Sequence, residues 1–580
     1  MKKYNVNFIN QNVSVTAIEG TTLSKVCDEA GLSLDLVCSG KGTCGKCKVE
    51  IELSGERKVV LACQTKISDD LIVYLSVNNY KKNTNILESV ADDGYIFNPS
   101  LKKIYKDKKT IINECTGEFL RNCSLNVLRT FSDLINQIEC NGITFVIYES
   151  EIIDVQMNDT TNFLYGAAVD IGTTSVVLYV YDLNTGNFIN AYSDLNRQIF
   201  VGADVISRIN YAERKKGLDD LNGKIILTLN NLVQRAEFEI PKLKENLYNI
   251  ALCGNSAMQH LFLGLRPDSL GTNPFTSITK DFVECLGKEI NLKCNEKSKV
   301  IFLPLLGGFV GADTTAVLLT IDDDDKNRLI IDLGTNGEIA VGNVNNYYVA
   351  STACGPALEG GSIDCGMRGT EGAVEKVKIE NNEVILNVIG NTEPSGICGS
   401  GIIDVVAELL RNKIIDNTGK MLSSDEYEQM RPYSQLSKRL IEINGINSFI
   451  LYEKNSKIIY INQKDIRQIQ LAKSSIYSGC MALLNAYGRS VHNMDEIIVA
   501  GAFGNYIDVN NAVYIGLLPN SLDKIKTVGN GAGKGVAMFL LDGSMREKSR
   551  KIASNSTHYE LANDDKFTIG YIDNMNFNIR

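Results

Sequence analysis

Residues 167–186 read AAVDIGTTSVVLYVYDLNTG, and residues 329–346 read LIIDLGTNGEIAVGNVNN. Each stretch has an apolar strand that ends in an aspartate, Asp170 or Asp332, followed by an apolar residue, Gly and Thr before a second strand. One such turn is a weak signal, but two copies in one chain indicate an internal repeat. The pattern therefore predicts a domain with two related halves, each built around a strand–turn–strand hairpin.

The two turns carry groups that suit a phosphate. A glycine at each turn lets backbone N–H groups approach phosphate oxygens, and the neighbouring Thr and Asn side chains add donors. A carboxylate at the end of each strand can hold Mg²⁺ through water, so the two aspartates are the predicted catalytic residues. The predicted phosphate-binding residues are Gly172, Thr173, Thr174, Gly334, Thr335 and Asn336.

This repeat resembles the superfamily of actin, sugar kinases, Hsp70 and acetate kinase, which holds ATP in a cleft between two related halves. The superfamily's third element is an apolar strand that runs into glycines beside the adenosine. EIIVAGAFGNY (496–506) matches it with Gly501 and Gly504. VGNGAGKGVAMF (528–539) looks like a P-loop, but Gly535 stands where that motif needs Ser or Thr, so we expect a glycine turn that opens a helix.

Other residues near glycines fit the same cleft. Asn255 and Asp313 lie in glycine-rich stretches and are further candidates for it. For Cys354 we favour a tight inter-domain turn over a chemical role. Asp204 and Arg208 have the i, i+4 spacing of an ion pair within a helix, and we favour that pair over a role in the cleft.

The N-terminal region raises a separate question, because cysteines cluster in CSGKGTCGKC (38–47) and a fourth follows in LACQT. The candidate ligands Cys38, Cys44, Cys47 and Cys63 have the spacing C-x5-C-x2-C-x15-C. Glycines in this loop let the backbone wrap closely around a cluster. A four-cysteine zinc ribbon is the alternative, but it normally has two C-x2-C pairs, and here there is one.

Residues 1–80 are predicted to form a β-grasp domain. The sequence pattern over this range gives a pair of strands, a short helix, the cysteine loop and three further strands. Plant-type ferredoxins have C-x4-C-x2-C, and the first spacing here is one residue longer. The loop therefore resembles the adrenodoxin-like branch of the [2Fe–2S] ferredoxins, and the resemblance implies a [2Fe–2S] cluster on the four cysteines. Cys27 lies in the predicted helix and is expected in the core.

The remaining boundaries follow from composition and periodicity. Asn, Asp and Lys accumulate over residues 81–110, which are predicted to be a linker. An amphipathic helix and a strand pair then predict a small α+β domain at 111–163, to which we assign no chemistry. The ATPase domain takes residues 164–580. The predicted fold class is multi-domain α/β and α+β: a β-grasp ferredoxin domain, a small α+β middle domain and an actin-like two-lobed ATPase domain.

Composition excludes several classes of protein. The 580 residues carry a formal net charge of −10 without a long basic stripe, so nucleic acid is not an expected partner. No apolar run approaches about 18 residues, and the N-terminus lacks a signal-peptide pattern, so we expect a cytoplasmic protein without membrane spans. Fifteen cysteines in a reducing compartment argue against a disulfide framework, and three histidines make a Ser-His-Asp triad a poor candidate.

A [2Fe–2S] domain joined to such an ATPase is a rare combination. Over nearly its whole length the chain resembles the reductive activators of corrinoid-dependent proteins. The stretches that carry this resemblance are CSGKGTCGKC, AAVDIGTTSV, FVGADTTA, IIDLGTNGEIAVG, GPALEGG, GICGSG and VAGAFGNYI. It implies that ATP, with Mg²⁺, helps an electron pass through the cluster to reduce inactive cob(II)alamin to cob(I)alamin. It also implies a homodimer, a low-potential electron donor, and as substrate a corrinoid protein of a methyltransferase system or a corrinoid iron–sulfur protein.

Two other functions stay open at this point. One is a small-molecule kinase or chaperone-like ATPase with a ferredoxin as redox sensor. The other is an ATP-driven electron activator of another low-potential enzyme, such as the 2-hydroxyacyl-CoA dehydratases, whose activators carry their cysteines within the ATPase. The chain does not look like a corrinoid carrier itself, because Met258 stands where the D-x-H-x-x-G pattern around His260 needs Asp.

Overall fold

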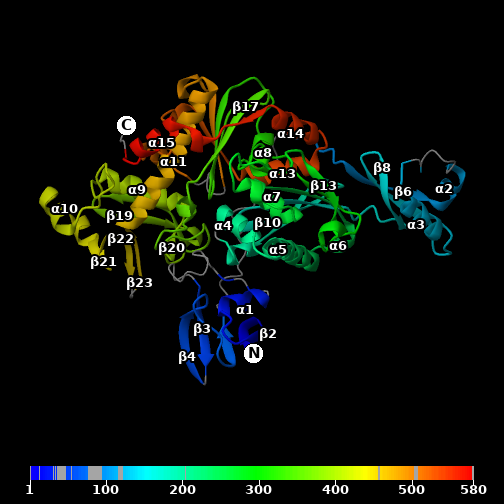
Figure 1. Ribbon diagram of the computed structural model, residues 1–580, viewed down its shortest axis with the longest axis horizontal. Helices are drawn as coiled ribbons and strands as arrows, with labels where there is room; N and C mark the ends of the chain where they lie inside the picture. Colours follow the sequence, from blue (N-terminus) through cyan, green and yellow to red (C-terminus); the bar gives the residue numbers. More distant parts are fainter. Residues whose placement is uncertain are drawn as a thin grey trace.

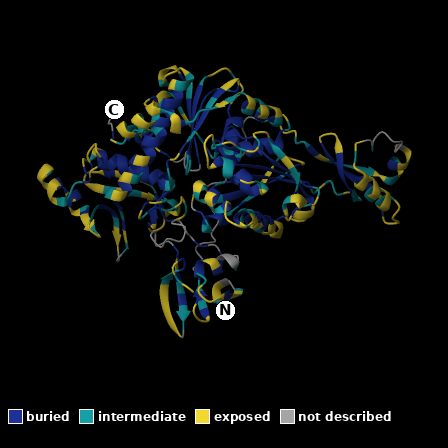
Figure 2. Cartoon of the chain, viewed as in Figure 1, coloured by how far each residue is buried: buried dark blue, intermediate teal, exposed yellow. Residues whose placement is uncertain are grey.

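The structure is a computed structural model that describes residues 2–11, 13–30, 32, 34, 47–53, 55–75, 95–114, 120, 122–202, 204–454, 457–501 and 507–577. Two large lobes lie side by side, with the N-terminal domain below their junction and a small domain at one end (Figure 1). Buried residues concentrate in the sheets and where the lobes meet, while exposed residues cover the outer helices (Figure 2). In the described part of the chain, no helix combines the length and the apolar character needed to cross a bilayer.

The N-terminal domain is a β-grasp, as predicted. Its sheet has the order β2-β1-β5-β3-β4, with β1 and β5 parallel at the centre. The elements are β1 (Lys3–Phe8), β2 (Val13–Ile18), α1 (Leu23–Glu29), β3 (Lys48–Leu53), β4 (Glu56–Leu61) and β5 (Leu71–Tyr74). Cys27 on α1 is fully buried in the core of this domain, as expected.

The small domain is a three-stranded sheet, in the order β6-β7-β8, with two helices. Its elements are β6 (Leu101–Asp107), α2 (Lys108–Glu114), α3 (Leu125–Ile135), β7 (Gly142–Tyr148) and β8 (Glu151–Met157). Residues 101–110 thus form β6 and the start of α2, so the prediction of a linker is wrong there. The reason is that β6 is an edge strand with three lysines, and its polarity hides the strand pattern. Asn98 is also fixed, because its N–H donates to the carbonyl of Leu541 at 3.0 Å.

The first lobe is built on a six-stranded sheet in the order β11-β10-β9-β12-β14-β13. Its strands are β9 (Tyr165–Ile171), β10 (Ser175–Asp182), β11 (Phe188–Leu195), β12 (Leu247–Gly254), β13 (Val283–Leu286) and β14 (Lys299–Phe302). Its helices are α4 (Val205–Ala212), α5 (Gly217–Glu239), α6 (Leu243–Asn246), α7 (Ser256–Leu263) and α8 (Ala312–Leu319). β9 pairs antiparallel with β10 and parallel with β12, so the first predicted phosphate turn lies beside the end of β12.

The second lobe repeats this arrangement in the order β25-β24-β15-β16-β17-β26. Its strands are β15 (Arg328–Leu333), β16 (Gly337–Asn343), β17 (Asn346–Thr352), β24 (Glu496–Ala500), β25 (Ile525–Gly529) and β26 (Ser556–His558). β15 pairs antiparallel with β16 and parallel with β24, as β9 does with β10 and β12. The internal repeat that the sequence predicts is therefore confirmed at the level of strand order and direction.

Between β17 and β24 the second lobe carries an insertion whose two long helices share a hydrophobic core with strands β15, β16 and β24. It contains β18 (Ala373–Glu380), β19 (Glu383–Val388), β20 (Gly396–Ile397), α9 (Gly399–Arg411), α10 (Ser424–Met430), β21 (Leu440–Ile443), β22 (Ile446–Lys454), β23 (Lys457–Asn462) and α11 (Gln463–Tyr487). After β24 come α12 (Val509–Tyr514), α13 (Gly531–Leu541), α14 (Met545–Ser554) and α15 (Asp565–Asp573).

The two lobes share one hydrophobic core because α13 packs on α8 and β9 of the first lobe. The expected glycine turn that opens a helix is confirmed here, since β25 ends at Gly529 and Asn530 caps α13. The contact is close at Gly535, where a Cβ would lie 1.7 Å from the carbonyl oxygen of Ala316. Only glycine allows the two helices to approach so closely.

We expect Gly535→Ala to destabilise the ATPase domain by about 1–3 kcal/mol, because an added methyl meets backbone that cannot move aside. Gly223→Ala is the matched control, since Gly223 lies on α5 with nothing within 4 Å of its Cβ position. That variant should gain about 0.5–1 kcal/mol from helix propensity. Urea unfolding followed by circular dichroism checks both, and equal midpoints for the two variants would contradict the close contact.

Candidate functional site

The turn after β9 is held in place by two asparagine side chains. Asn196 Nδ2 donates to the carbonyl of Gly172 at 2.9 Å, and the N–H of Asn196 donates to the carbonyl of Thr174 at 3.0 Å. Asn255 Nδ2 donates to Thr173 Oγ1 at 3.1 Å, and Asn255 also caps α7. These bonds use carbonyls and a hydroxyl, so they leave the turn's N–H groups out of the network. Asn255, a candidate from the sequence, is therefore brought to the predicted phosphate turn.

Arg208 is a third support of this turn, and the predicted ion pair with Asp204 is wrong. Arg208 is fully buried and donates from Nη2 to the carbonyl of Thr173 and from Nε to that of Gly202. Asp204 instead caps α4 by accepting from the N–H of Ser207 at 2.8 Å. Burial lowers the pKa of Arg208 to about 9. The i, i+4 spacing is compatible with an ion pair to Asp204 and with the observed hydrogen bonds to backbone carbonyls. Arg208 takes the second arrangement because it is buried beside carbonyls that need a donor.

The turn after β15 has different supports. Thr335 Oγ1 donates to the Glu359 carboxylate at 3.2 Å, and the N–H of Gly334 donates to the carbonyl of Asn336 at 3.0 Å. The Cys354 thiol lies 3.3 Å from the carbonyl of Gly334 and 3.4 Å from that of Thr335. Cys354 therefore packs on the second phosphate turn, which is a more specific position than the expected inter-domain turn.

The third predicted element also meets the second turn. β24 runs parallel to β15, with Ala500 beside Asp332, and Gly501 follows with φ +120°. A Cβ on Gly501 would lie 2.3 Å from the carbonyl oxygen of Leu333, so the close approach of the two chains requires glycine. Gly504 lies outside the described residues.

Carboxyl groups from both lobes lie within electrostatic range of one another near the two turns. Burial, and then the charge of Asp313, raise the pKa of Asp170 to about 7. The same two causes, with Asp170 and Glu359 added, raise the pKa of Asp332 to about 7. Burial raises the pKa of Asp313, at the start of α8, to about 6. The two predicted catalytic aspartates are thus close enough to disturb each other, and Asp313 from the sequence analysis joins them.

Two further acids at this place were missed by the sequence analysis. Glu338 stands opposite Asp332 in the β15–β16 pairing, and burial followed by Asp313 raises its pKa far above the usual range. Burial also raises the pKa of Glu359. Glu359 lies in GPALEGG, a stretch that carried the family resemblance, so the signal was present without an assigned role.

The donor set fits a magnesium nucleotide. Carboxylates at strand ends are the ligands that Mg²⁺ takes, directly or through water, when it also binds phosphate oxygens. Glycine turns with threonines supply N–H and hydroxyl donors for the phosphates themselves. A bound divalent ion would also relieve the crowding of the acids, because a nearby positive charge favours their ionised forms.

Two of the four predicted cluster ligands are in the described part of the chain. Cys47 and Cys63 are buried in the β-grasp core, and their sulfur atoms lie 3.2 Å apart. That separation is too long for a disulfide of about 2.05 Å, and it brings two sulfurs to one point, as ligands of one cluster require. Gln64 Nε2 points at Cys63 Sγ at 3.6 Å, a contact of the kind that tunes cluster potentials. Cys38 and Cys44 lie outside the described residues.

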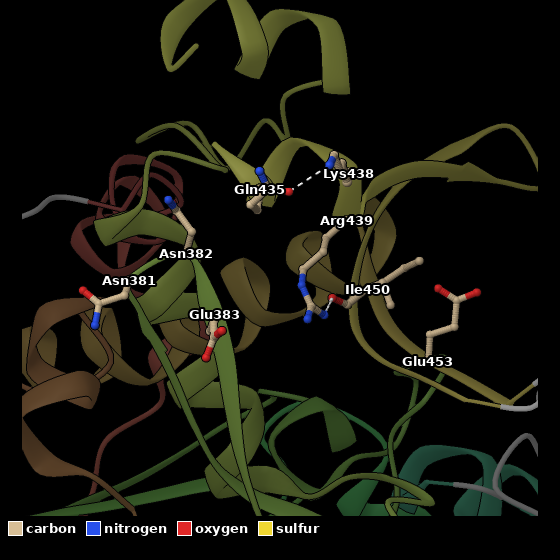
Figure 3. A pocket seen from close by; sticks show the side chains of 8 residues that line it. All are labelled: Asn381, Asn382, Glu383, Gln435, Lys438, Arg439, Ile450 and Glu453. Carbon is tan, nitrogen blue, oxygen red and sulfur yellow. Dashed lines mark hydrogen bonds between the residues drawn. The ribbon is translucent and has the colours of Figure 1, made fainter. Parts of the chain in front are cut away.

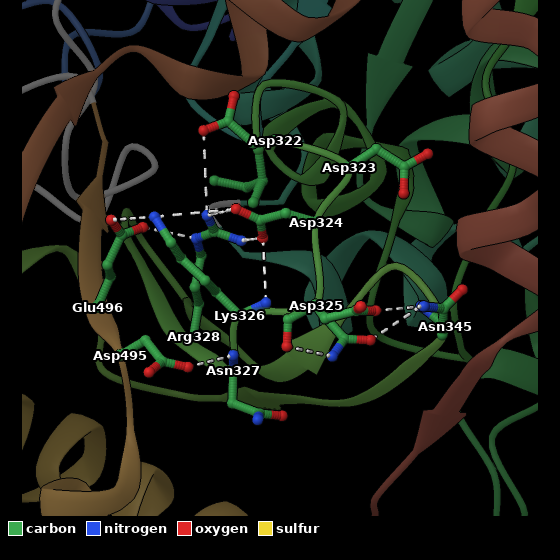
Figure 4. Close-up of polar contacts among 12 residues, drawn as sticks. Asp322, Asp323, Asp324, Asp325, Lys326, Asn327, Arg328, Asn345, Asp495 and Glu496 are labelled. Carbon is green, nitrogen blue, oxygen red and sulfur yellow. Dashed lines mark hydrogen bonds and ion pairs between the residues drawn. The ribbon is translucent and has the colours of Figure 1, made fainter.

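An ion-pair network around the buried Arg328 fixes the start of β15 against β24 (Figure 4). Arg328 is 2% exposed and donates to Asp324 and, from Nε, to Glu496 at 2.7 Å. Hydrogen bonds from Lys526 and then from Arg328 lower the pKa of Glu496 to about 2. Because Asp332 is the last residue but one of β15 and Gly501 follows β24 directly, this network sets the register of two parts of the site.

A pocket of about 520 Å³ lies elsewhere on the second lobe, between the β18–β19 turn and β22 (Figure 3). Its lining mixes acids, bases and amides: Asn381, Asn382, Glu383, Gln435, Lys438, Arg439, Ile450 and Glu453. None of the predicted site residues lines it, so it has no part in the site between the turns.

Comparisons with known families cover most of the chain. Residues 7–68 match "2Fe-2S iron-sulfur cluster binding domain", residues 165–326 match "RACo middle region", and residues 326–579 match "C-terminal domain of RACo the ASKHA domain". The family's middle region therefore coincides with the first lobe and not with the small α+β domain.

Comparisons with individual proteins agree. The chain is 42% identical over 573 residues to the corrinoid activation enzyme RamQ of Eubacterium limosum, which covers 96% of each protein. It is 23% identical over 453 residues to the Co(II) methylated amine-specific corrinoid protein reductase of Methanosarcina barkeri, covering 71% of this chain and 77% of that one. A solved structure described as a reductive activator for corrinoid, iron-sulfur protein superposes with a TM-score of 0.76 at 28% identity, over 99% of this chain and 98% of the other.

We expect anaerobically purified protein to carry two irons and two acid-labile sulfides per chain, and Cys63→Ser to lose them. Cys27→Ala is the matched control, because Cys27 is a buried thiol of the same domain without ligand spacing. It should keep the iron and the visible absorption. Iron and sulfide analysis with ultraviolet–visible spectra checks this, and stoichiometric zinc without visible absorption would contradict the ligand assignment.

We expect binding of Mg·ADP to tighten as the pH rises through about 7, the pKa to which Asp170 and Asp332 are raised. Below that pH both carboxyls are protonated in the free protein, and Mg²⁺ binds their ionised forms, so binding must release protons. Titration calorimetry in two buffers of different ionisation heat measures the release. Asp332→Asn should release fewer protons than wild type. The nucleotide's own titration contributes equally to both proteins, so it cancels in this comparison. Identical release from both proteins would contradict the role of Asp332.

Proposed function

The chain belongs to the family of reductive activators of corrinoid proteins, and from that premise we propose that it reduces the cobalt of a corrinoid protein at the expense of ATP. One electron leaves the reduced [2Fe–2S] cluster and converts cob(II) to cob(I), while ATP and water become ADP and phosphate. The observation that carries the proposal is the presence on one chain of two adjacent cysteine sulfurs in a β-grasp domain and of two equivalent strand–turn–strand hairpins.

The roles proposed for the residues follow the geometry of the two turns. Gly172, Thr173, Thr174, Gly334, Thr335 and Asn336 would bind phosphates. Asp170 and Asp332 would hold Mg²⁺, with Asp313 nearby, and Gly501 would lie beside the adenosine.

ATP matters because reduction of cob(II) to cob(I) is uphill from ordinary cellular donors. The cluster supplies a one-electron path when it is bound, but it adds no driving force. A nucleotide can change the equilibrium only if it binds two states of the protein with different affinity. We therefore propose that ATP favours a complex in which the corrinoid protein is more easily reduced.

The finer parts of the proposal concern assembly. We propose a homodimer, a separate low-potential electron donor, and a ferredoxin domain over residues 1–80 that is joined to the ATPase domain at 164–580 through the small α+β domain. The partner is a corrinoid protein of a methyltransferase system or a corrinoid iron–sulfur protein.

The direct test mixes the reduced protein, Mg·ATP and a corrinoid protein in the cob(II) state and follows the cob(I) absorption band. Wild type should form cob(I) only with ATP present. Asp332→Asn should lose ATP-dependent formation of cob(I) by at least about tenfold while its cluster spectrum is unchanged, because the site and the cluster lie on separate domains.

Cys63→Ser is the complementary variant, since it should keep ATP binding and lose electron transfer. If wild type forms no cob(I) with any corrinoid protein of these classes, the proposed function is wrong. Loss of both nucleotide binding and cluster in a single variant would indicate misfolding, and the analogous substitutions Asp170→Asn and Cys47→Ser would then be used.

A further inference from the structure

The ferredoxin domain rests on a short segment of the first lobe. Phe200, which is partly buried, packs against the hydrophobic core of the ferredoxin domain. That core contains Cys47 and Cys63, the described cluster ligands. The domain lies directly below the junction of the two lobes, with α1 turned toward them (Figure 1). The apolar contact therefore joins the cluster domain to the ATPase at a defined point.

Phe200 is the last residue of the 3₁₀ helix η4 (Arg197–Phe200), which follows β11 directly. The other end of η4 is fixed by Asn196, whose Oδ1 accepts from the N–H of Gln198 at 3.1 Å. Asn196 is also the residue that donates to the carbonyls of Gly172 and Thr174. Asn196 thus caps η4 and at the same time holds the backbone of the predicted phosphate turn.

A second connection runs through the middle of η4. Gln198 is fully buried, and its Oε1 accepts from Nη1 of Arg208 at 3.2 Å. Arg208 in turn donates to the carbonyl of Thr173. η4 is therefore linked to all three residues of the turn, through its cap Asn196 or through the buried guanidinium of Arg208.

The peptide groups of the turn face both ways. The carbonyls of Gly172, Thr173 and Thr174 accept from Asn196 and Arg208. The peptides of the first two carbonyls carry the N–H groups of Thr173 and Thr174, which we infer donate to a bound phosphate. A peptide that donates to an anion becomes a stronger acceptor at its carbonyl, because hydrogen bonds in a chain polarise one another. Phosphate binding on one side should therefore strengthen the bonds that hold η4 on the other.

We propose that η4 is the docking surface of the ferredoxin domain, and that docking at Phe200 and nucleotide binding at the first turn favour each other. The inference rests on the proposed function in one respect, that the turn after β9 binds the nucleotide phosphates. The inference adds a domain interface and the sign of its coupling to the nucleotide. Bound Mg·ATP stabilises the contact between the cluster domain and the ATPase domain, and release of ADP and phosphate after hydrolysis weakens that contact.

Coupling of this kind is reciprocal, so it can be measured from either side. The test uses the full-length protein with its cluster and the non-hydrolysable Mg·AMPPNP. Phe200→Ala should bind the analogue about fivefold more weakly than wild type, the lower end of ordinary coupling between sites. Phe200→Leu, which keeps most of the apolar contact, should lie between them.

Hydrogen exchange measures the effect of nucleotide binding on the ferredoxin domain. In wild type, Mg·AMPPNP should slow exchange in η4 and in strands β1 and β5 of the ferredoxin domain, and in Phe200→Ala the ferredoxin strands should not respond. Phe238→Ala is the matched control, because Phe238 is an aromatic of the same lobe that is 84% exposed on α5. It should behave as wild type in both measurements.

Equal analogue affinity in Phe200→Ala and wild type would overturn the inference. Weaker binding with an unchanged exchange response in the ferredoxin strands would also overturn it, since local damage to η4 alone gives that result. Neither measurement involves a corrinoid protein. If these two measurements overturn the inference, the proposed formation of cob(I) is unaffected. If the coupling is observed but no cob(I) forms with a corrinoid protein, only the proposed function is wrong.

Discussion

The structure depends most on the cost of holding several acids together between two hairpins. Asp170 and Asp332 are the last residues but one of equivalent strands in two repeated sheets. Asp313, Glu338 and Glu359 lie within electrostatic range of one or both of them. Burial raises the pKa of all five acids, and repulsion from neighbouring acids raises those of Asp170, Asp332 and Glu338 further. Ionising the set without a cation is therefore unfavourable. Binding of a magnesium nucleotide would favour the ionised forms of these acids and so relieve this cost.

The surrounding parts serve to keep this arrangement in place. α13 crosses to the first lobe at Gly535, so the two halves share one core. Arg328 locks β15 to β24 at the far end from the acids. Around the first turn, buried Asn196 and Arg208 hold the backbone carbonyls and continue into η4, where Phe200 meets the cluster domain. The predicted nucleotide site and the cluster domain are thus connected through few residues, most of them buried.

The sequence predicts the parts of the site that depend on local pattern. Asp-x-Gly-Thr after an apolar strand identifies both turns, because the chemistry of a phosphate turn requires those residue types in that order. It does not reveal Glu338, which occupies an ordinary strand position and becomes part of the site only through the β15–β16 pairing. Arg208 was assigned to an ion pair because spacing alone cannot show which buried carbonyl a guanidinium meets. No local sequence pattern marks Phe200, because its contact is with a domain more than a hundred residues earlier in the chain. Strand β6 is not recognised from the sequence because its three lysines mask the strand pattern.

The central claim is that ATP hydrolysis between the hairpins is coupled to a corrinoid partner. The most direct measurement is the rate of phosphate release by the full-length protein with and without a corrinoid protein prepared in the cob(II) state. The account predicts that the cob(II) partner stimulates release, and that sugars, organic acids and other small metabolites neither stimulate it nor become phosphorylated. Indifference to the corrinoid protein, together with transfer of phosphate to a small metabolite, would contradict the account and make the chain a kinase with a ferredoxin sensor.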